Sequence, residues 1–415
     1  MLRYVHCTGR SLPEQIYNEE LPTEKVYPSS PQIIMLEKTF KLSLMERLSL
    51  LGVLVRLPFN LLYTAAFSAF LTRTRGKRML RILTEQLPRF LIAKCSPRQL
   101  QYFLGPSLAR YSQWAKKNSI QPVIEEVEGC DAKIVWQTEK RKDRVLFFIH
   151  GGGYMTPFVD NMLLYCPGLR KALLKQTGGK QDFGIAALVY TIYPATFPTQ
   201  LTEFTLALTQ MISSGVSPEN IILIGDSAGA NLIIQLILHT LRPVPDVPLS
   251  PLGAIEGIDV PRRRLGGIAL ISPWISLGSP VPSYARNTKY DFLTAEPLTR
   301  WGSYYMEEVK ASHIPWVKPS SSTLFKGIGM MVQRLLITAG GRECLLDDAT
   351  TLYAMIEELQ IPEEELVVTL DVDEKGLHED AILDIESPQK PKGGLGDATM
   401  RQVSWIREAF EAATS

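Results

Sequence analysis

Apolar runs of strand length alternate with helical patterns from about residue 120 onward. Strands separated by helices indicate βαβ units and a mostly parallel sheet. Eight such runs fit one doubly wound domain with helices on both faces. We therefore predict an α/β fold whose strands lie near Val123–Val127, Lys133–Gln137, Arg144–Ile149, Ile185–Tyr193, Asn220–Ile224, Gly267–Ser272, Arg334–Thr338 and Glu365–Val372.

The N-terminal part of the chain lacks this alternation of strand and helix patterns. Residues 1–35 are polar and carry four prolines, and no apolar core with a cleavage site follows the start, so we expect an irregular arm and not a signal peptide. Residues 1–119 are predicted to form this arm and cap or membrane-associating helices, and residues 120–415 the main domain. Two insertions are expected in the main domain, near residues 242–266 and 280–325.

Residues 48–71 form the most apolar window of the chain. Its 24 residues are long enough to cross a bilayer, but Arg56 and Pro58 near its middle oppose a span. Three interpretations stay open: helices of a cap, a helix lying in the membrane interface, and a true span. Basic residues follow Leu71, so a span would place the main domain in the cytosol.

Composition excludes several classes of partner. The formal net charge is +1, so no basic excess points to nucleic acid. The five cysteines are scattered without a Cys-x-x-Cys pair, which argues against a zinc ribbon or a disulfide framework. The sequence has neither a Gly-x-x-x-x-Gly-Lys-Ser/Thr loop nor a His-Glu-x-x-His motif. We expect no metal and no organic cofactor.

The stretch Gly225-Asp226-Ser227-Ala228-Gly229 lies between an apolar strand and an apolar helix. Strand, Gly-x-Ser-x-Gly and helix are the context of a nucleophile elbow. The turn is tight, so the residues flanking the serine need almost no side chain. This pattern predicts that Ser227 is lifted above the sheet as a nucleophile.

A second glycine motif, His150-Gly151-Gly152-Gly153, follows the strand that ends at Ile149. Three consecutive glycines leave backbone amides free to point into a cavity. Such amides can hold the oxyanion that develops during acyl transfer, and losing one such donor costs about 3 kcal/mol of barrier. A glycine-rich turn without chemistry is the alternative, and the elbow downstream disfavours it.

Ser227 needs a base, because a serine hydroxyl is a poor nucleophile at neutral pH. The chain order of α/β-hydrolases is serine, acid, histidine. His378 follows the last predicted strand and fits that order. The other four histidines lie in the arm, the glycine motif, the helix after the elbow and the second insertion: His6, His150, His239 and His313.

The acid that orients the imidazole should follow the strand Arg334–Thr338. Glu343 is the acid nearest the end of this strand, and we predict it as the third member. Asp347 is the alternative, although it falls at the start of a helix, where a carboxylate also stabilises the helix dipole.

These motifs resemble the hormone-sensitive-lipase branch of the α/β-hydrolase esterases. The resemblance extends over roughly residues 120–385 and includes Tyr190 to Pro198 and Ser272-Pro273-Trp274. Within the branch the chain is most similar to fungal steryl acetyl hydrolases and to arylacetamide deacetylases. The branch usually has Asp-Pro-Leu-x-Asp where this chain has Glu343 to Asp347, so the first acid is one methylene longer.

The resemblance implies a serine esterase that removes a short, acetyl-type acyl group from a hydrophobic alcohol. Ser227 would be the nucleophile and His378 the base, with the amides of Gly151, Gly152 and Ala228 as oxyanion hole. An amidase or formamidase, an acyltransferase and a non-catalytic receptor remain alternatives. The expected partner is a small hydrophobic ester. The expected location is intracellular, and if residues 48–71 associate with a membrane, the endoplasmic reticulum membrane or another membrane surface is expected.

Overall fold

A computed structural model describes residues 41–253, 264–388, 390 and 394–412. Its core is one eight-stranded sheet of order β1-β2-β4-β3-β5-β6-β7-β8. The first two pairings, β1 with β2 and β2 with β4, are antiparallel, and the others are parallel. The predicted eight-stranded, mostly parallel sheet is confirmed, with strands β1 Val123–Glu126, β2 Lys133–Trp136, β3 Val145–Ile149, β4 Gly184–Val189, β5 Ile221–Asp226, β6 Gly267–Ile271, β7 Arg334–Gly340 and β8 Val367–Asp373.

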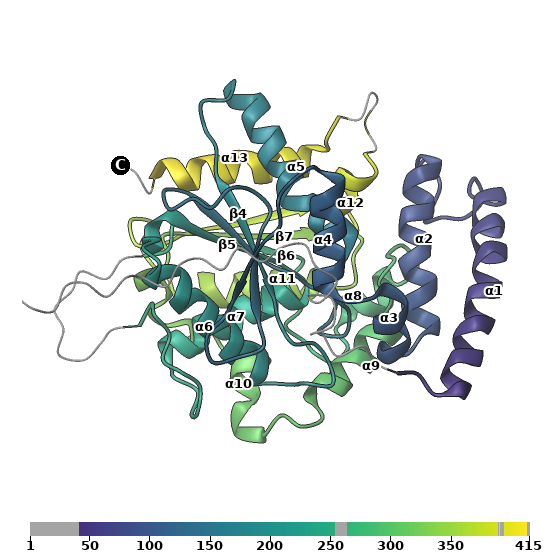
Figure 1. Cartoon of the computed structure of the whole chain (residues 1–415), viewed down its shortest axis with the longest axis horizontal. Helices are drawn as coiled ribbons and strands as arrows, with labels where there is room; N and C mark the ends of the chain where they lie inside the picture. The colour runs from purple at the N-terminus through teal and green to yellow at the C-terminus, as the bar shows by residue number, and fades with distance from the viewer. Residues whose placement is uncertain (1–40, 254–263, 389, 391–393, 413–415) are drawn as a thin grey trace, which may run out of the picture.

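Helices cover both faces of this sheet (Figure 1). On β3, Val145, Phe147 and Ile149 face one hydrophobic cluster, whereas Leu146 and Phe148 face the other. This alternation is what a strand buried on both faces requires. The first cluster is covered by α6 Thr199–Ser213, α7 Ala228–Leu241 and α11 Leu346–Glu357, and the second by α4 Ser107–Lys117, α5 Asp160–Thr177 and α13 Asp397–Ala412.

The second predicted insertion supplies a group of short helices beside the sheet. They are α8 Pro282–Asn287, α9 Ala295–Met306 and α10 Ile314–Val317, with 3₁₀ turns Ala311–His313 and Ser322–Phe325. Further short elements are the 3₁₀ turns Pro218–Asn220 and Ile328–Met330 and the helix α12 Asp380–Glu386, which follows β8. Part of the first predicted insertion, residues 254–263, lies outside the described residues.

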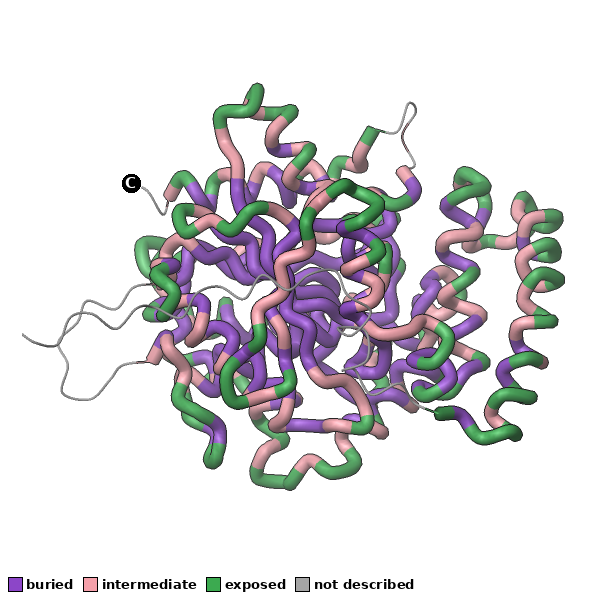
Figure 2. Tube along the Cα trace, viewed as in Figure 1, coloured by how far each residue is buried: buried purple, intermediate pink, exposed green. Residues whose placement is uncertain are grey.

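Three helices precede α4: α1 Leu44–Ala66, α2 Met79–Lys94 and α3 Pro97–Leu104. Figure 1 shows α1 outermost, with α2 between it and the rest of the protein. Figure 2 shows that most of α1 is exposed while the sheet is buried. By length and composition, α1 is a candidate membrane span. The predicted boundary at residue 119 stays a prediction, although α4 packs against α5 on the sheet.

Candidate active site

Ser227 occupies a strained turn between β5 and α7. Its φ is 51° and its ψ is −113°, a combination that L-residues rarely adopt. A Cβ on Gly229 would lie 2.0 Å from the carbonyl oxygen of Ile149, so glycine is required there. The turn is fixed by a hydrogen bond of 2.8 Å from the Ser227 amide to the carbonyl oxygen of Ile271. This is the local geometry that the Gly-x-Ser-x-Gly pattern predicted.

The glycine loop after β3 approaches the same point. Gly152 and Gly153 have φ of 88° and 63°, and both line the cavity above Ser227. The Gly151 amide, which we expected to face an oxyanion, instead donates a hydrogen bond of 2.9 Å to Asp226 Oδ1. Within the described residues, the amides of Gly152, Gly153 and Ala228 have no recorded acceptor. The Gly151 amide is thus already used, whereas the amides of Gly152 and Gly153 remain available to an acceptor in the cavity.

His378 lies in the loop between β8 and α12 and lines the same cavity as Ser227. Its ring is almost fully buried, and burial lowers its pKa, while the charges of Asp291 and Asp226 oppose this shift. The imidazole therefore stays neutral, and able to accept a proton, to lower pH than a free histidine. Its Nδ1 lies 3.8 Å from Glu343 Oε2, and its Nε2 lies 3.2 Å from Glu379 Oε1.

The two candidate acids lie in different surroundings. Glu343 is fully buried, faces Nδ1 of His378, and accepts a hydrogen bond of 2.7 Å from Ser272 Oγ. Burial holds the pKa of Glu343 well above its usual range, and the charge of Asp291 raises it further. Asp347 instead accepts from the Ser283 amide and pairs with Arg286. The structure thus brings Glu343, and not Asp347, to the histidine.

Asp291 was missed by the sequence analysis. It lies between α8 and α9, fully buried, and accepts hydrogen bonds from the amides of Cys344 (2.8 Å) and His378 (3.3 Å). One carboxylate thereby holds the two loops that carry Glu343 and His378. No motif marks it in the sequence, because its partners lie 53 and 87 residues away along the chain.

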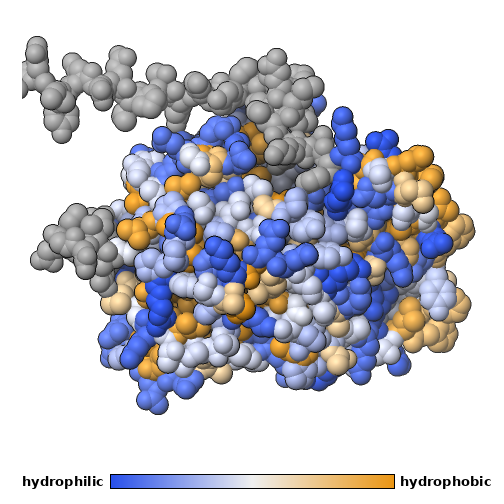
Figure 3. Space-filling model, turned by 90° about the horizontal axis from the view of Figure 1, so that it is seen from below, coloured by the Kyte–Doolittle hydropathy of each residue, from blue (hydrophilic) through white to orange (hydrophobic). Residues whose placement is uncertain are grey.

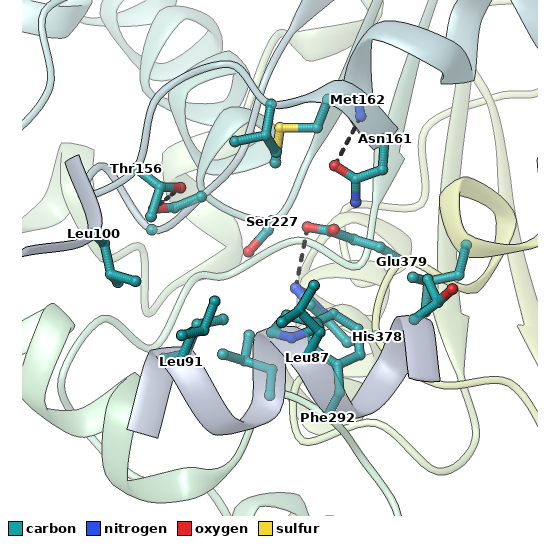
Figure 4. A pocket seen from close by; sticks show the side chains of 18 of the residues that line it. Leu87, Leu91, Leu100, Thr156, Asn161, Met162, Ser227, Phe292, His378 and Glu379 are labelled. Atoms are coloured by element: carbon teal, nitrogen blue, oxygen red, sulfur yellow. Dashed lines mark hydrogen bonds and ion pairs between the residues drawn. The ribbon is translucent and has the colours of Figure 1, made fainter. Parts of the chain in front are cut away.

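Glu379 was also missed, although it directly follows His378. It lines the cavity together with Ser227 and His378, and its carboxyl group contacts that of Asp226. Figure 4 shows Glu379 pointing into the space between Ser227 and the imidazole of His378. Its position next to the predicted base was the one available signal.

The cavity above Ser227 has a volume of about 450 Å³. Most of its wall is apolar and comes from α2, α3, α5 and the second insertion. Figure 4 shows Leu87, Leu91 and Leu100 around the space into which Ser227 points. Trp274, Phe292, Leu293, Leu298 and Trp301 complete this apolar wall. The site can therefore hold a hydrophobic molecule against the serine.

The remaining described histidines have other partners. His150 stacks between Phe158 and Tyr190, and burial lowers its pKa to about 4. His239 accepts from the Val244 amide, and His313 packs on the rings of Phe197 and Trp316. Among the described residues, no group of three His, Cys, Asp or Glu side chains could hold a metal ion.

The fold and the site define an α/β-hydrolase with a serine elbow, a histidine after the last strand and a glycine loop. The chain belongs to the steryl acetyl hydrolase family, whose family model matches residues 112–389, more than half of its length. This confirms the resemblance inferred from the motifs.

Curated relatives agree with this membership, and solved structures share the fold. An acetyl-hydrolase of Streptomyces hygroscopicus is 28% identical over 54% of this chain and 66% of its own length. An arylacetamide deacetylase of Oryctolagus cuniculus is 28% identical over 45% of this chain and 46% of its own. The matches thus span less than two thirds of these relatives. The crystal structure of EstE5 is 20% identical, with a TM-score of 0.54 over 78% of this chain and 97% of that one, and shows the fold alone.

Proposed function

We propose that this protein is a serine esterase that removes an acetyl-type acyl group from a hydrophobic alcohol. One observation carries the proposal. Ser227, in its elbow, and His378 open together onto an apolar cavity, beside amides of Gly152, Gly153 and Ala228 that have no recorded acceptor in the described part of the chain.

The reaction proceeds in two halves. Ser227 Oγ attacks the ester carbonyl while His378 Nε2 takes its proton. The oxyanion that forms accepts hydrogen bonds from the amides of Gly152, Gly153 and Ala228. His378 then returns the proton to the leaving alcohol. A water molecule, activated by the same imidazole, cleaves the acyl-enzyme and restores Ser227.

The nature of the cavity supports a hydrophobic alcohol as the leaving group. Its volume of about 450 Å³ exceeds what an acetyl group needs, and its wall is mostly apolar. Burying apolar surface contributes about 0.8 kcal/mol per methylene. The names of the family and of two relatives, steryl acetyl hydrolase, acetyl-hydrolase and arylacetamide deacetylase, support the short acyl group.

Two substrate series test this assignment. With the alcohol fixed as 4-nitrophenol, kcat/KM should fall as the acyl chain lengthens from acetate to laurate. With the acyl group fixed as acetyl, kcat/KM should rise by about fourfold for each methylene added to an aliphatic alcohol, because about 0.8 kcal/mol of burial accompanies each. A maximum at laurate, with no dependence on the alcohol, would instead indicate a lipase with a deep acyl pocket.

An amidase with the same residues is the second candidate, favoured by the arylacetamide deacetylases among the relatives. Comparing 4-nitroacetanilide with 4-nitrophenyl acetate separates the two activities. A non-catalytic receptor is disfavoured because both Ser227 and His378 are retained and line one cavity. Labelling by a fluorophosphonate probe at Ser227 would contradict a pure receptor.

We also propose that α1 lies on a lipid surface. One side of α1 packs on α2 and α3, and its buried residues are Leu50, Val53 and Thr64. The other face exposes a stripe of large apolar side chains at helical spacing: Leu44, Leu48, Leu51, Val55, Phe59 and Leu62. Figure 3 shows hydrophobic side chains gathered at this end of the molecule. A contiguous apolar patch of this kind marks a protein or membrane contact.

Polar contacts favour a helix lying on the membrane over one spanning it. Asn60 on α1 accepts a hydrogen bond from Gln86 on α2, and the Gln99 side chain donates to the Glu46 carbonyl oxygen (2.9 Å). If α1 crossed the membrane, it would lose these hydrogen bonds to α2 and α3. Exposed Arg56 and Arg75 can face anionic headgroups beside the apolar stripe. Because Leu61 of α1 also lines the cavity, a membrane-borne ester would meet the site near this surface.

Flotation with vesicles of phosphatidylcholine and phosphatidylserine tests the lipid contact. The triple variant Leu51→Glu, Phe59→Glu, Leu62→Glu should reduce the partition coefficient onto the vesicles by at least about 10³-fold, since each of the three large apolar side chains contributes about 1.5–3 kcal/mol when it is buried. A matched triple variant of exposed apolar residues elsewhere, Leu249→Glu, Ile314→Glu, Met330→Glu, should bind like the wild type. Equal binding by all three proteins would refute the contact, and resistance to alkaline extraction would indicate a span.

A further inference from the structure

Glu379 has an unusual backbone conformation. Its φ of 51° lies in the left-handed region, which a glutamate adopts only where its surroundings hold it. Its amide donates a hydrogen bond of 3.1 Å to Ser272 Oγ, and the Ser272 hydroxyl in turn donates to Glu343. The backbone of Glu379 is thus tied to the same serine that holds the predicted acid of the site. Its side chain is thereby directed into the cavity.

The carboxyl group of Glu379 lies where the base of the reaction would meet Ser227. Its Oε1 is 3.2 Å from Nε2 of His378. When the neutral imidazole carries its proton on Nδ1, toward Glu343, Nε2 can only accept a hydrogen bond. The contact with Glu379 then requires a proton on the Glu379 carboxyl group, or a second proton on the imidazole.

The contact between Glu379 and Asp226 also requires a proton on one of the two carboxyl groups. Asp226 is fully buried, its Oδ1 accepts from the Gly151 amide, and its Oδ2 has no donor among the described residues. Its carboxyl group contacts that of Glu379, and in the described part of the chain neither group pairs with a lysine or arginine. Two buried carboxylates in contact cannot both be ionised, so the pair holds at least one proton.

Among the described groups that face this pair, His378 is the one that can carry a positive charge, and that charge would lower the pKa of Asp226. Tyr165, Cys166 and Tyr190 are neutral, and Asp291 adds negative charge. Burial raises the pKa of Glu379 to about 7, with a further rise from the charge of Asp291. Burial and the charge of Glu379 hold the pKa of Asp226 well above its usual range. The pair therefore keeps its second proton to higher pH than free carboxyl groups would.

We propose that Glu379 is a positioning residue of the reaction: it shares a proton with Asp226, and it leaves Nε2 of His378 open to Ser227 only when a single proton lies between the two carboxyl groups. With two protons on the pair, the Glu379 hydroxyl donates to Nε2 and occupies it. With one, that proton bridges Glu379 and Asp226. No covalent bond other than O–H is made or broken in this change. The inference rests on the proposed function, because it concerns the same serine and histidine.

The pH dependence of kcat/KM for 4-nitrophenyl acetate tests this role. In the wild type, activity is lost toward low pH by two protonations, on His378 and on the pair, so the limiting slope of log kcat/KM against pH should approach two. In Glu379→Gln the amide donates to Asp226 and only His378 titrates. The slope should fall to one and the midpoint should move to lower pH, because burial lowers the pKa of His378.

Asp380→Asn is the matched control. Asp380 is the next residue, but it accepts from the Leu377 amide and pairs with Arg81, and it does not line the cavity. It should keep the wild-type slope and midpoint. Glu379→Leu, which leaves Asp226 without a carboxyl partner, should lower the melting temperature and still show a slope of one. Fluorophosphonate labelling at high pH reports that each variant is folded.

The outcomes separate this inference from the proposed function. If the wild type shows no hydrolysis that depends on Ser227, the proposed function fails. If the wild type hydrolyses the ester with a slope of one, or if Glu379→Gln keeps the wild-type profile, only the role of Glu379 is overturned. Loss of activity at every pH in a folded Glu379→Gln variant also overturns it, since the glutamine would then be unable to leave Nε2 open.

Discussion

Replacing Ser227 by alanine is expected to lower kcat for 4-nitrophenyl acetate by about 10⁶-fold, the loss typical of removing the nucleophile of a serine hydrolase. The residue is 3% exposed and its backbone is held by β5, β6 and α7, so the loss of one oxygen should leave the fold intact. Only the attacking atom disappears, while the amides and the cavity remain. KM should therefore change little.

Ser112→Ala provides a matched control. Ser112 lies on α4, where its hydroxyl donates to the Leu108 carbonyl oxygen within the same helix. Its kcat should stay within about twofold of the wild type, and fluorophosphonate should label it fully, whereas Ser227→Ala should not be labelled. Retention of activity within tenfold in Ser227→Ala would mean that another group performs the attack.

The strands and the elbow could be predicted because their signals are local. Residues 221–224 are all apolar, and Gly225 and Gly229 flank the serine turn at the carboxyl end of this strand. The order of serine, acid and histidine then selected His378 out of five histidines. Each of these steps needs only neighbouring residues or chain order.

The polar groups around His378 could not be predicted in the same way. Asp291 lies in the second insertion, and only the packing of three loops brings it to the amides of His378 and Cys344. The hydrogen bond from Gly151 to Asp226 likewise joins two motifs and rotates one amide out of the predicted oxyanion hole. Such contacts depend on side-chain direction in the folded protein, which a sequence pattern does not specify.

For the apolar window near residues 48–71, the sequence predicted a hydrophobic helix but not its surroundings. Its composition left helices of a cap, an interfacial helix and a span open, because hydrophobicity alone does not determine what covers a helix. In the structure, only 17% of the most apolar part of α1 is buried, and the same helix contacts α2 through Asn60. The exposed stripe and the polar contacts, seen together, favour the interfacial interpretation that we propose.

Glu343→Gln is expected to lower kcat by about 10³- to 10⁴-fold, a loss similar to that of other serine hydrolases whose acid is changed to its amide. Glu343 faces Nδ1 of His378 from within the protein, and its Oε2 is fixed by Ser272. As Ser227 transfers its proton, the imidazolium gains a charge that only a nearby carboxylate can stabilise in this dry site. Glutamine has nearly the same shape as glutamate, but it lacks the negative charge of the carboxylate.

Asp347→Asn is the matched comparison, because Asp347 is the other acid of the same loop and pairs with exposed Arg286. Exposed ion pairs contribute about 0–1 kcal/mol, so its kcat should remain within about threefold of the wild type. Asp291→Asn completes the set and should lose activity less than Glu343→Gln, since Asp291 contacts backbone amides and not Nδ1. A larger loss in Asp347→Asn or Asp291→Asn would transfer the role of the acid to that residue.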